Sequence, residues 1–220
     1  MPSYHAHIKF RTGAIYLPRQ LTNSFGRGSV LREGLPVERG LCRGPDRLPE
    51  CGHLQRLEVF TELQPSLVIY DILGDVVCGG FSQPIRDGFA EEVYIVTSGE
   101  LEALYQAVNV MGAVRRFSTR SGAKLGGLIV NLRGLKDEQQ MVTDFAEQLG
   151  TRVIAVNPFS QLIKECSGSA KTVFEEHSDS AEAENYRQLA VTIMADTHDH
   201  AVPGTMTFEE LYEWWSGYVN

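Results

Sequence analysis

The sequence lacks the features by which membrane, secreted and nucleic-acid-binding proteins are usually recognised. No apolar run in its 220 residues approaches the roughly 20 that a membrane-spanning helix needs. The first residues hold no apolar stretch typical of a secretory signal. The net charge is −8, and no basic patch of the kind found in nucleic-acid binders is visible. We therefore expect a cytoplasmic protein whose partners include neither a membrane nor a nucleic acid.

Cysteine is also scarce. The chain has four cysteines, which are Cys42, Cys51, Cys78 and Cys166. Disulfide frameworks are typical of secreted chains, whereas thiols in a reducing compartment stay free. We therefore interpret these cysteines as free thiols or metal ligands. The rest of the composition, 43% hydrophobic and 22% charged residues, is ordinary for a globular protein.

Regular periodicity is missing from the first part of the chain. Residues 1–54 are rich in proline, glycine and arginine, and only residues 14–17 could form a strand. From residue 55 onward, apolar runs alternate with helical patterns. We therefore predict two units: a divergent, poorly structured segment over 1–54 and an α/β domain over 55–220.

Within this domain, short apolar runs predict buried parallel strands at residues 67–71, 93–97, 125–131 and 152–156. Apolar residues with a helical period predict helices at residues 100–117, 137–149, 181–196 and 207–217. Thr207 with Glu210 forms a capping box, and Ser98 is a candidate cap for the first helix. The alternation of strands and helices predicts a parallel sheet with helices on both faces.

The most unusual stretch is Tyr70-Asp-Ile-Leu-Gly-Asp-Val-Val-Cys-Gly-Gly-Phe81. Asp71 ends a strand, where open α/β sheets bind ligands. In P-loop ATPases such an acid holds the water shell of Mg²⁺. Asp75, four residues later, is suited to orienting a water or sensing a γ-phosphate. The glycines after Cys78 let backbone N–H groups approach its sulfur and bond a cluster sulfide.

These residues resemble the nitrogenase iron protein family. The similarity continues through KLGGLIVNLRG, KTVFEE, EAENYRQLA and TMTFEELYE, and covers roughly residues 55–220. The stretch after Phe81 is closer to the nitrogenase branch than to the related light-independent protochlorophyllide reductase iron protein. The resemblance implies an α/β fold of the P-loop NTPase type that is incomplete at its N-terminus.

The resemblance also implies a homodimer whose two subunits share one [4Fe–4S] cluster, each giving two cysteines. Cys78 matches one ligand. Cys42 follows Gly34-Leu-Pro36 at the family's spacing and is the candidate for the second, with Cys51 as the weaker alternative. Cys166 is expected to be incidental.

The family uses MgATP to drive electron transfer. By resemblance, Asp71 lies on the Mg²⁺ side of the nucleotide site, Asp75 is the switch acid that assists hydrolysis, and Asn131 lies near the adenine. Arg86 lies where the family docks on its catalytic partner, a nitrogenase-like component. Reduced ferredoxin or flavodoxin is the expected electron donor.

One motif of that family is missing. The phosphate loop G-x-x-x-x-G-K-[ST], whose N–H groups and lysine cradle phosphates, occurs nowhere in the sequence. Pro158-Phe-Ser160 also replaces a Pro-Arg-Asp near the nucleotide. Two alternatives therefore stay open: an ATP-dependent electron-transfer component, and a degenerate paralogue or truncated gene product that acts at most as a binding or assembly protein.

A possible metal site lies near the C-terminus, where His198 and His200 alternate with Asp196 and Asp199. We interpret this stretch as a polar loop before Pro203 and not as a metal site.

Overall fold

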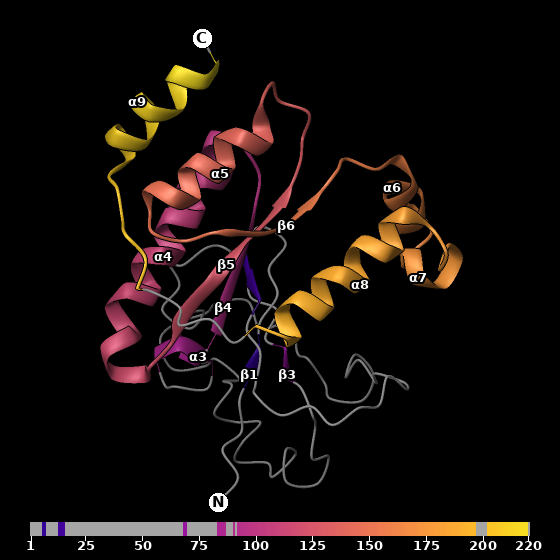
Figure 1. The fold of residues 1–220 in the computed structure, drawn as a ribbon, viewed down its shortest axis with the longest axis horizontal. Helices are drawn as coiled ribbons and strands as arrows, with labels where there is room; N and C mark the ends of the chain where they lie inside the picture. The colour runs from indigo at the N-terminus through magenta and orange to yellow at the C-terminus, as the bar shows by residue number, and fades with distance from the viewer. Residues whose placement is uncertain are drawn as a thin grey trace, which may run out of the picture.

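A four-stranded sheet with helices on both faces organises the computed structural model of the chain (Figure 1). The structure describes residues 6–7, 13–15, 68–69, 83–86, 90, 92–196 and 202–219. Strand order in this sheet is β2-β4-β5-β6. The prediction of an α/β sheet flanked by helices is confirmed.

Three strands of the sheet run parallel. They are β4 (Glu92–Thr97), β5 (Lys124–Asn131) and β6 (Val153–Asn157). Each lies within one residue of its predicted bounds, because an apolar run that is buried on both faces of a sheet is a strong local signal.

The remaining strands differ from the expected parallel arrangement. β2 (Gly13–Ile15) pairs with β4 in antiparallel orientation, and an antiparallel edge strand is common in otherwise parallel sheets. β3 (Val68–Ile69) forms inside the predicted strand 67–71, but it pairs with β1 (Ala6–His7) in a separate two-stranded sheet. Because β2 and β5 occupy both edges of β4, β3 cannot pair there.

Four long helices follow the predicted pattern. They are α4 (Leu101–Ser121), α5 (Glu138–Gln148), α8 (Ala181–Met194) and α9 (Phe208–Val219). α4 runs four residues past its predicted end and stops at Gly122, whose φ of 74° is the left-handed conformation that closes many helices. Three short helices were not predicted: α3 (Gln83–Arg86), α6 (Gln161–Gly168) and α7 (Val173–Glu176).

The two predicted caps have different outcomes. The capping box at α9 is confirmed: Thr207 N donates to Glu210 Oε2 at 2.7 Å, and Glu210 N donates to Thr207 Oγ1 at 3.2 Å. The prediction that Ser98 caps the first long helix is wrong, because α4 has Glu100 at its N-cap position. The Ser98 hydroxyl instead accepts a hydrogen bond from Glu100 N at 3.4 Å.

The sheet buries a different apolar cluster on each face. On one face, α4, α5 and α9 pack over Val93 and Ile95 of β4, with Phe145 fully buried between them. On the other face, α8 packs over Tyr94 of β4 and Ile129 of β5. Successive residues of β4 therefore point to opposite clusters, as the pleat of a strand requires.

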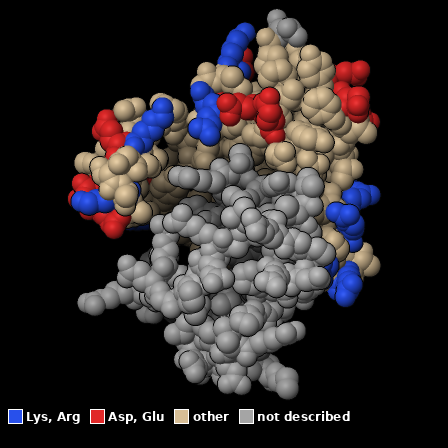
Figure 2. All heavy atoms as spheres, turned by 180° about the vertical axis from the view of Figure 1, so that it is seen from behind, with Lys and Arg blue, Asp and Glu red and all other residues tan. Residues whose placement is uncertain are grey.

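The charged surface is mixed. On the face seen in Figure 2, basic and acidic side chains occur in small groups of both signs over the described part of the chain. Among the helices of these described residues, none is long and apolar enough to cross a membrane.

Candidate functional site

The parallel strands β4, β5 and β6 end at one edge of the sheet, with Thr97, Asn131 and Asn157 as their last residues. We call this edge, with the turns that follow the strands (98–100, 132–137 and 158–160), the carboxyl edge. Open α/β sheets bind their ligands at this edge, because strand ends and helix starts present backbone and polar groups there. It is therefore the candidate functional site.

Two asparagines join neighbouring strands at the carboxyl edge. Asn157 is 7% exposed, and its Nδ2 donates to Oδ1 of Asn131 at 2.9 Å. The backbone N–H of Leu132 also donates to the carbonyl oxygen of Asn157, at 2.9 Å. The amide oxygen of Asn131 accepts the bond from Asn157, and its N–H₂ group provides two further hydrogen-bond donors. The structure thus brings Asn131 to the carboxyl edge, half-buried and with a fixed orientation.

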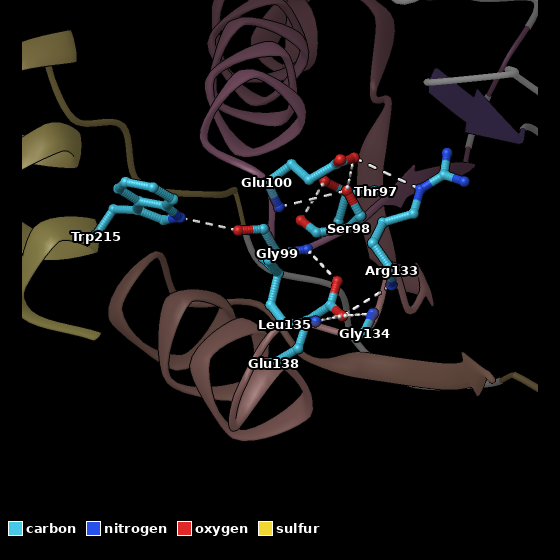
Figure 3. Close-up of polar contacts among 9 residues, drawn as sticks. All are labelled: Thr97, Ser98, Gly99, Glu100, Arg133, Gly134, Leu135, Glu138 and Trp215. Atoms are coloured by element: carbon cyan, nitrogen blue, oxygen red, sulfur yellow. Dashed lines mark hydrogen bonds and ion pairs between the residues drawn. The ribbon is translucent and has the colours of Figure 1, made fainter. Parts of the chain in front are cut away.

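A buried carboxylate lies behind these strand ends (Figure 3). Glu138, the first residue of α5, is 3% exposed. Its Oε1 accepts the N–H of Gly99 at 2.9 Å, and its Oε2 accepts the N–H groups of Arg133, Gly134 and Leu135 at 2.8, 2.8 and 3.1 Å. Four backbone donors therefore compensate one buried negative charge, as burial of a charge requires.

Gly99 is held from both sides. Its N–H reaches Glu138, and its carbonyl oxygen accepts the indole Nε1–H of Trp215 in α9 at 2.9 Å. A Cβ added at Gly99 would lie 2.6 Å from Cγ of Glu138 and 2.8 Å from Cε of Met141, so the close approach requires glycine. Sequence reasoning missed this arrangement, since an acid in the first turn of a helix is usually interpreted as complementing the helix dipole.

Two oppositely charged residues lie at the surface of the carboxyl edge. Glu100 and Arg133, about half exposed, form an ion pair with Nε and Oε2 3.5 Å apart. A hollow of about 430 Å³ is lined by residues of the turn after β5 and of α5, among them Leu132, Gly134 and Glu138. Within this turn Gly134 has a φ of 91°, a conformation that favours glycine.

The turn after β6 contains Pro158-Phe-Ser160, where the family that the sequence resembles has Pro-Arg-Asp. In this structure, Phe159 and Ser160 both contact residues near them in the fold. Ser160 caps α6 by accepting the N–H of Ile163, and its hydroxyl donates to Glu182 at 2.7 Å. Phe159 is 52% exposed, and Nζ of Lys164 lies 4.4 Å from the centre of its ring. An exposed aromatic ring therefore stands at the carboxyl edge beside a cation.

A second polar cluster joins the residue Asp196, which follows α8, to the amino ends of β4 and β6. Asp196 is buried, forms an ion pair with Arg152, and accepts from the hydroxyl group of Tyr94 at 3.4 Å. The hydroxyl group of Tyr94 is also within 3.0 Å of Glu92 Oε2. Burial, followed by the charges of Glu92 and Asp196, raises the pKa of Tyr94 above its ordinary value.

Asp196 also belongs to the stretch of histidines and aspartates near the C-terminus. Asp196 is bound to Arg152, and the part of the chain that the structure describes holds no group of three or more potential metal-binding side chains. His198, Asp199 and His200 lie outside the described residues.

Of the remaining predicted site residues, the structure describes only Arg86. Asp71, Asp75, Cys78, Cys42 and Cys51 lie outside the described residues. Arg86 ends α3, a helix that packs against α4. Figure 1 shows α3 away from the carboxyl ends of the strands.

Cys166 lies within α6, is 4% exposed, and packs with Val173 and Ala183. Cys166 therefore packs as a small apolar residue.

Comparison with known proteins gives a consistent match. Residues 30–219 match the family model described as "4Fe-4S iron sulfur cluster binding proteins, NifH/frxC family". The chain is 43% identical to "Nitrogenase iron protein 2" of Methanothermobacter thermautotrophicus over 189 residues, which are 86% of this chain and 69% of the relative. It is 38% identical over 198 residues to "Nitrogenase iron protein 2" of Methanobacterium ivanovii, covering 90% of this chain and 73% of that protein.

Proposed function

Because the chain belongs to the NifH/frxC family of 4Fe–4S iron–sulfur cluster binding proteins, we propose that it is an electron-transfer component of the nitrogenase iron protein type. The family match over residues 30–219 is the observation that carries this proposal. In this role two copies of the chain hold one cluster and pass electrons to a nitrogenase-like catalytic partner. Reduced ferredoxin or flavodoxin is the proposed donor.

The chain has enough cysteines for a cluster shared between two copies. A [4Fe–4S] cluster takes four thiolates, so each copy must supply two. Cys166 is unsuitable, because it is 4% exposed inside α6. Cys78 and Cys42 are the proposed ligands, and Cys51 is the alternative to Cys42. When bound, the cluster supplies the one-electron redox centre.

The fit to a nucleotide is less complete. The amide group of Asn131 is held by Asn157 at the carboxyl edge, where it can donate to an acceptor nitrogen of a purine base. Asp71 and Asp75 are the proposed acids on the Mg²⁺ and γ-phosphate sides. The sequence holds no phosphate loop, however, and this absence favours the second candidate, a non-catalytic binding or assembly protein.

The cluster assignment can be tested with a matched pair of cysteine variants. The protein and its Cys78→Ser and Cys166→Ser variants are purified without oxygen, and iron is measured per chain. The proposal predicts about two iron atoms per chain in the unmodified dimer. Iron should be lost in the Cys78 variant and retained in the Cys166 variant, because Cys166 is buried within α6. Equal iron in the Cys78 variant and the unmodified protein would exclude Cys78 as a ligand.

A further inference from the structure

The carboxylate of Glu138 joins two turns that are far apart in the sequence. One is the turn between β4 and α4, reached through Gly99, and the other is the turn between β5 and α5, reached through residues 133–135. Figure 3 shows both turns converging on this one side chain. Oε1 accepts a hydrogen bond from the first turn, and Oε2 accepts hydrogen bonds from the second turn.

This contact also reaches the C-terminal helix. Trp215 of α9 donates to the carbonyl oxygen of Gly99, so the peptide groups of the first turn are bonded to α5 on one side and to α9 on the other. The ion pair between Glu100 and Arg133 bridges the same two turns at the surface. Glu100, Arg133 and Asn131 therefore share one edge, and their relative positions depend on the buried carboxylate behind them.

We propose that Glu138 is a positioning residue for nucleotide binding: its carboxylate locks the two turns together and thereby pre-organises the carboxyl edge, and Gly99 links this edge to α9. The inference rests on the proposed function, because it assigns Glu138 to the nucleotide-binding edge of that function. A pre-organised edge binds more tightly, since a loose edge must be ordered when the ligand arrives.

The substitution Glu138→Gln separates the two halves of this contact. Glutamine retains one carbonyl oxygen, which satisfies the three donors of the second turn best. Its NH₂ group then faces the N–H of Gly99, and two donors cannot bond each other. The variant should therefore release the first turn while it largely keeps the second.

The experiment compares the unmodified full chain with Glu138→Gln and Val142→Ala, all purified without oxygen. Val142 is fully buried in the same helix and contacts the apolar core, so its truncation lowers stability without removing a bond to either turn. Amide hydrogen exchange is measured at Gly99 and at residues 133–135, and MgADP affinity is measured by calorimetry at a temperature where every variant is folded.

We expect Glu138→Gln to speed exchange at Gly99 by about tenfold or more and to weaken MgADP binding by about tenfold, because a bond to a charged group is lost. Val142→Ala should leave MgADP affinity unchanged. If Glu138→Gln does not fold, Gly99→Ala provides the second test. Its Cβ would lie within 2.6 Å of Glu138 Cγ and so separate the same pair from the other side.

The outcomes distinguish the inference from the function on which it rests. Faster exchange at Gly99 with unchanged MgADP affinity overturns the positioning role and leaves nucleotide binding intact. An equal loss of affinity in Val142→Ala also overturns it, because the effect would then follow general stability. If the unmodified chain binds no MgADP, nucleotide binding itself fails, and the role of Glu138 fails with it.

Discussion

Replacing Asp196 by alanine should lower the free energy of unfolding by about 3 kcal/mol, because it removes the buried partner of Arg152. The Asp196 side chain is 1% exposed, whereas the Arg152 side chain is 38% exposed. The guanidinium group also donates through Nε to the carbonyl oxygen of Gly126 at 3.3 Å. Loss of Asp196 therefore leaves a cation that is tied to the sheet without its counter-charge.

The exposure of Arg152 sets the size of this effect. Breaking a fully buried pair costs about 3–5 kcal/mol, and Arg152 can turn partly toward water, so the lower end applies. The Tyr94 hydroxyl retains Glu92 as an acceptor at 3.0 Å and adds little to the loss. For a chain of this size, about 3 kcal/mol corresponds to a fall of roughly 6–12 °C in the midpoint of thermal unfolding.

The assay is thermal and denaturant unfolding of Asp196→Ala, with Glu176→Gln as the control. Glu176 pairs with Lys171 on the surface, and both side chains are substantially exposed, so its loss should leave the midpoint unchanged. A double-mutant cycle of Arg152→Gln with Asp196→Asn should give a coupling of at least about 1 kcal/mol. A midpoint shift below about 2 °C for Asp196→Ala, or a coupling near zero, would show that Arg152 and Asp196 do not stabilise the fold as a pair.

Three further outcomes follow from the same structure. The pKa of Tyr94 is raised in the folded protein, so the stability contributed by its neutral form is complete below pH 10 or so and is lost as pH rises above the unfolded value. Tyr94→Phe should therefore flatten the fall in stability above that pH by up to about 1.4 kcal/mol per pH unit, and parallel curves for the two proteins would contradict this. Gly126→Ala would bring a Cβ within 2.3 Å of the buried Tyr94 ring and should destabilise by about 3 kcal/mol in denaturant unfolding. Gly112→Ala in α4, where nothing lies within 4 Å, should instead stabilise by about 0.5–1 kcal/mol, and equal effects at both glycines would reject the steric account. Trp215→Phe removes the donor to Gly99 and should speed amide exchange at Glu100 and Leu101 by about three- to tenfold, whereas unchanged exchange would show that α9 does not hold this turn.

The parts of the fold that could be predicted from sequence are those with strong local signals. Apolar runs located β4, β5 and β6 to within one residue, and a helical period located α4, α5, α8 and α9. The capping box at Thr207 was readable because its two residues are three apart in the chain. The box formed by Thr172 and Glu175 carries the same signal, and its four-residue helix was missed because no apolar period supports it.

Long-range pairing could not be predicted in the same way. The antiparallel position of β2 depends on which strand edge is free when the chain folds, and an isolated three-residue segment does not encode this. Glu138 and Gly99 are 39 residues apart, so nothing near either of them indicates that they bond. The resemblance to a family indicated Asn131 as a site residue, but only the structure shows that Asn157 fixes its amide group.

The proposed function makes this chain a nucleotide-dependent electron-transfer component, although its sequence holds no phosphate loop. Calorimetric titration of the anaerobically purified protein with MgATP and MgADP measures this nucleotide binding. We expect binding with dissociation constants on the order of micromolar, with other groups of the chain serving in place of the loop. No binding at nucleotide concentrations on the order of millimolar would contradict it, and the chain alone could not then be an ATP-dependent reductase.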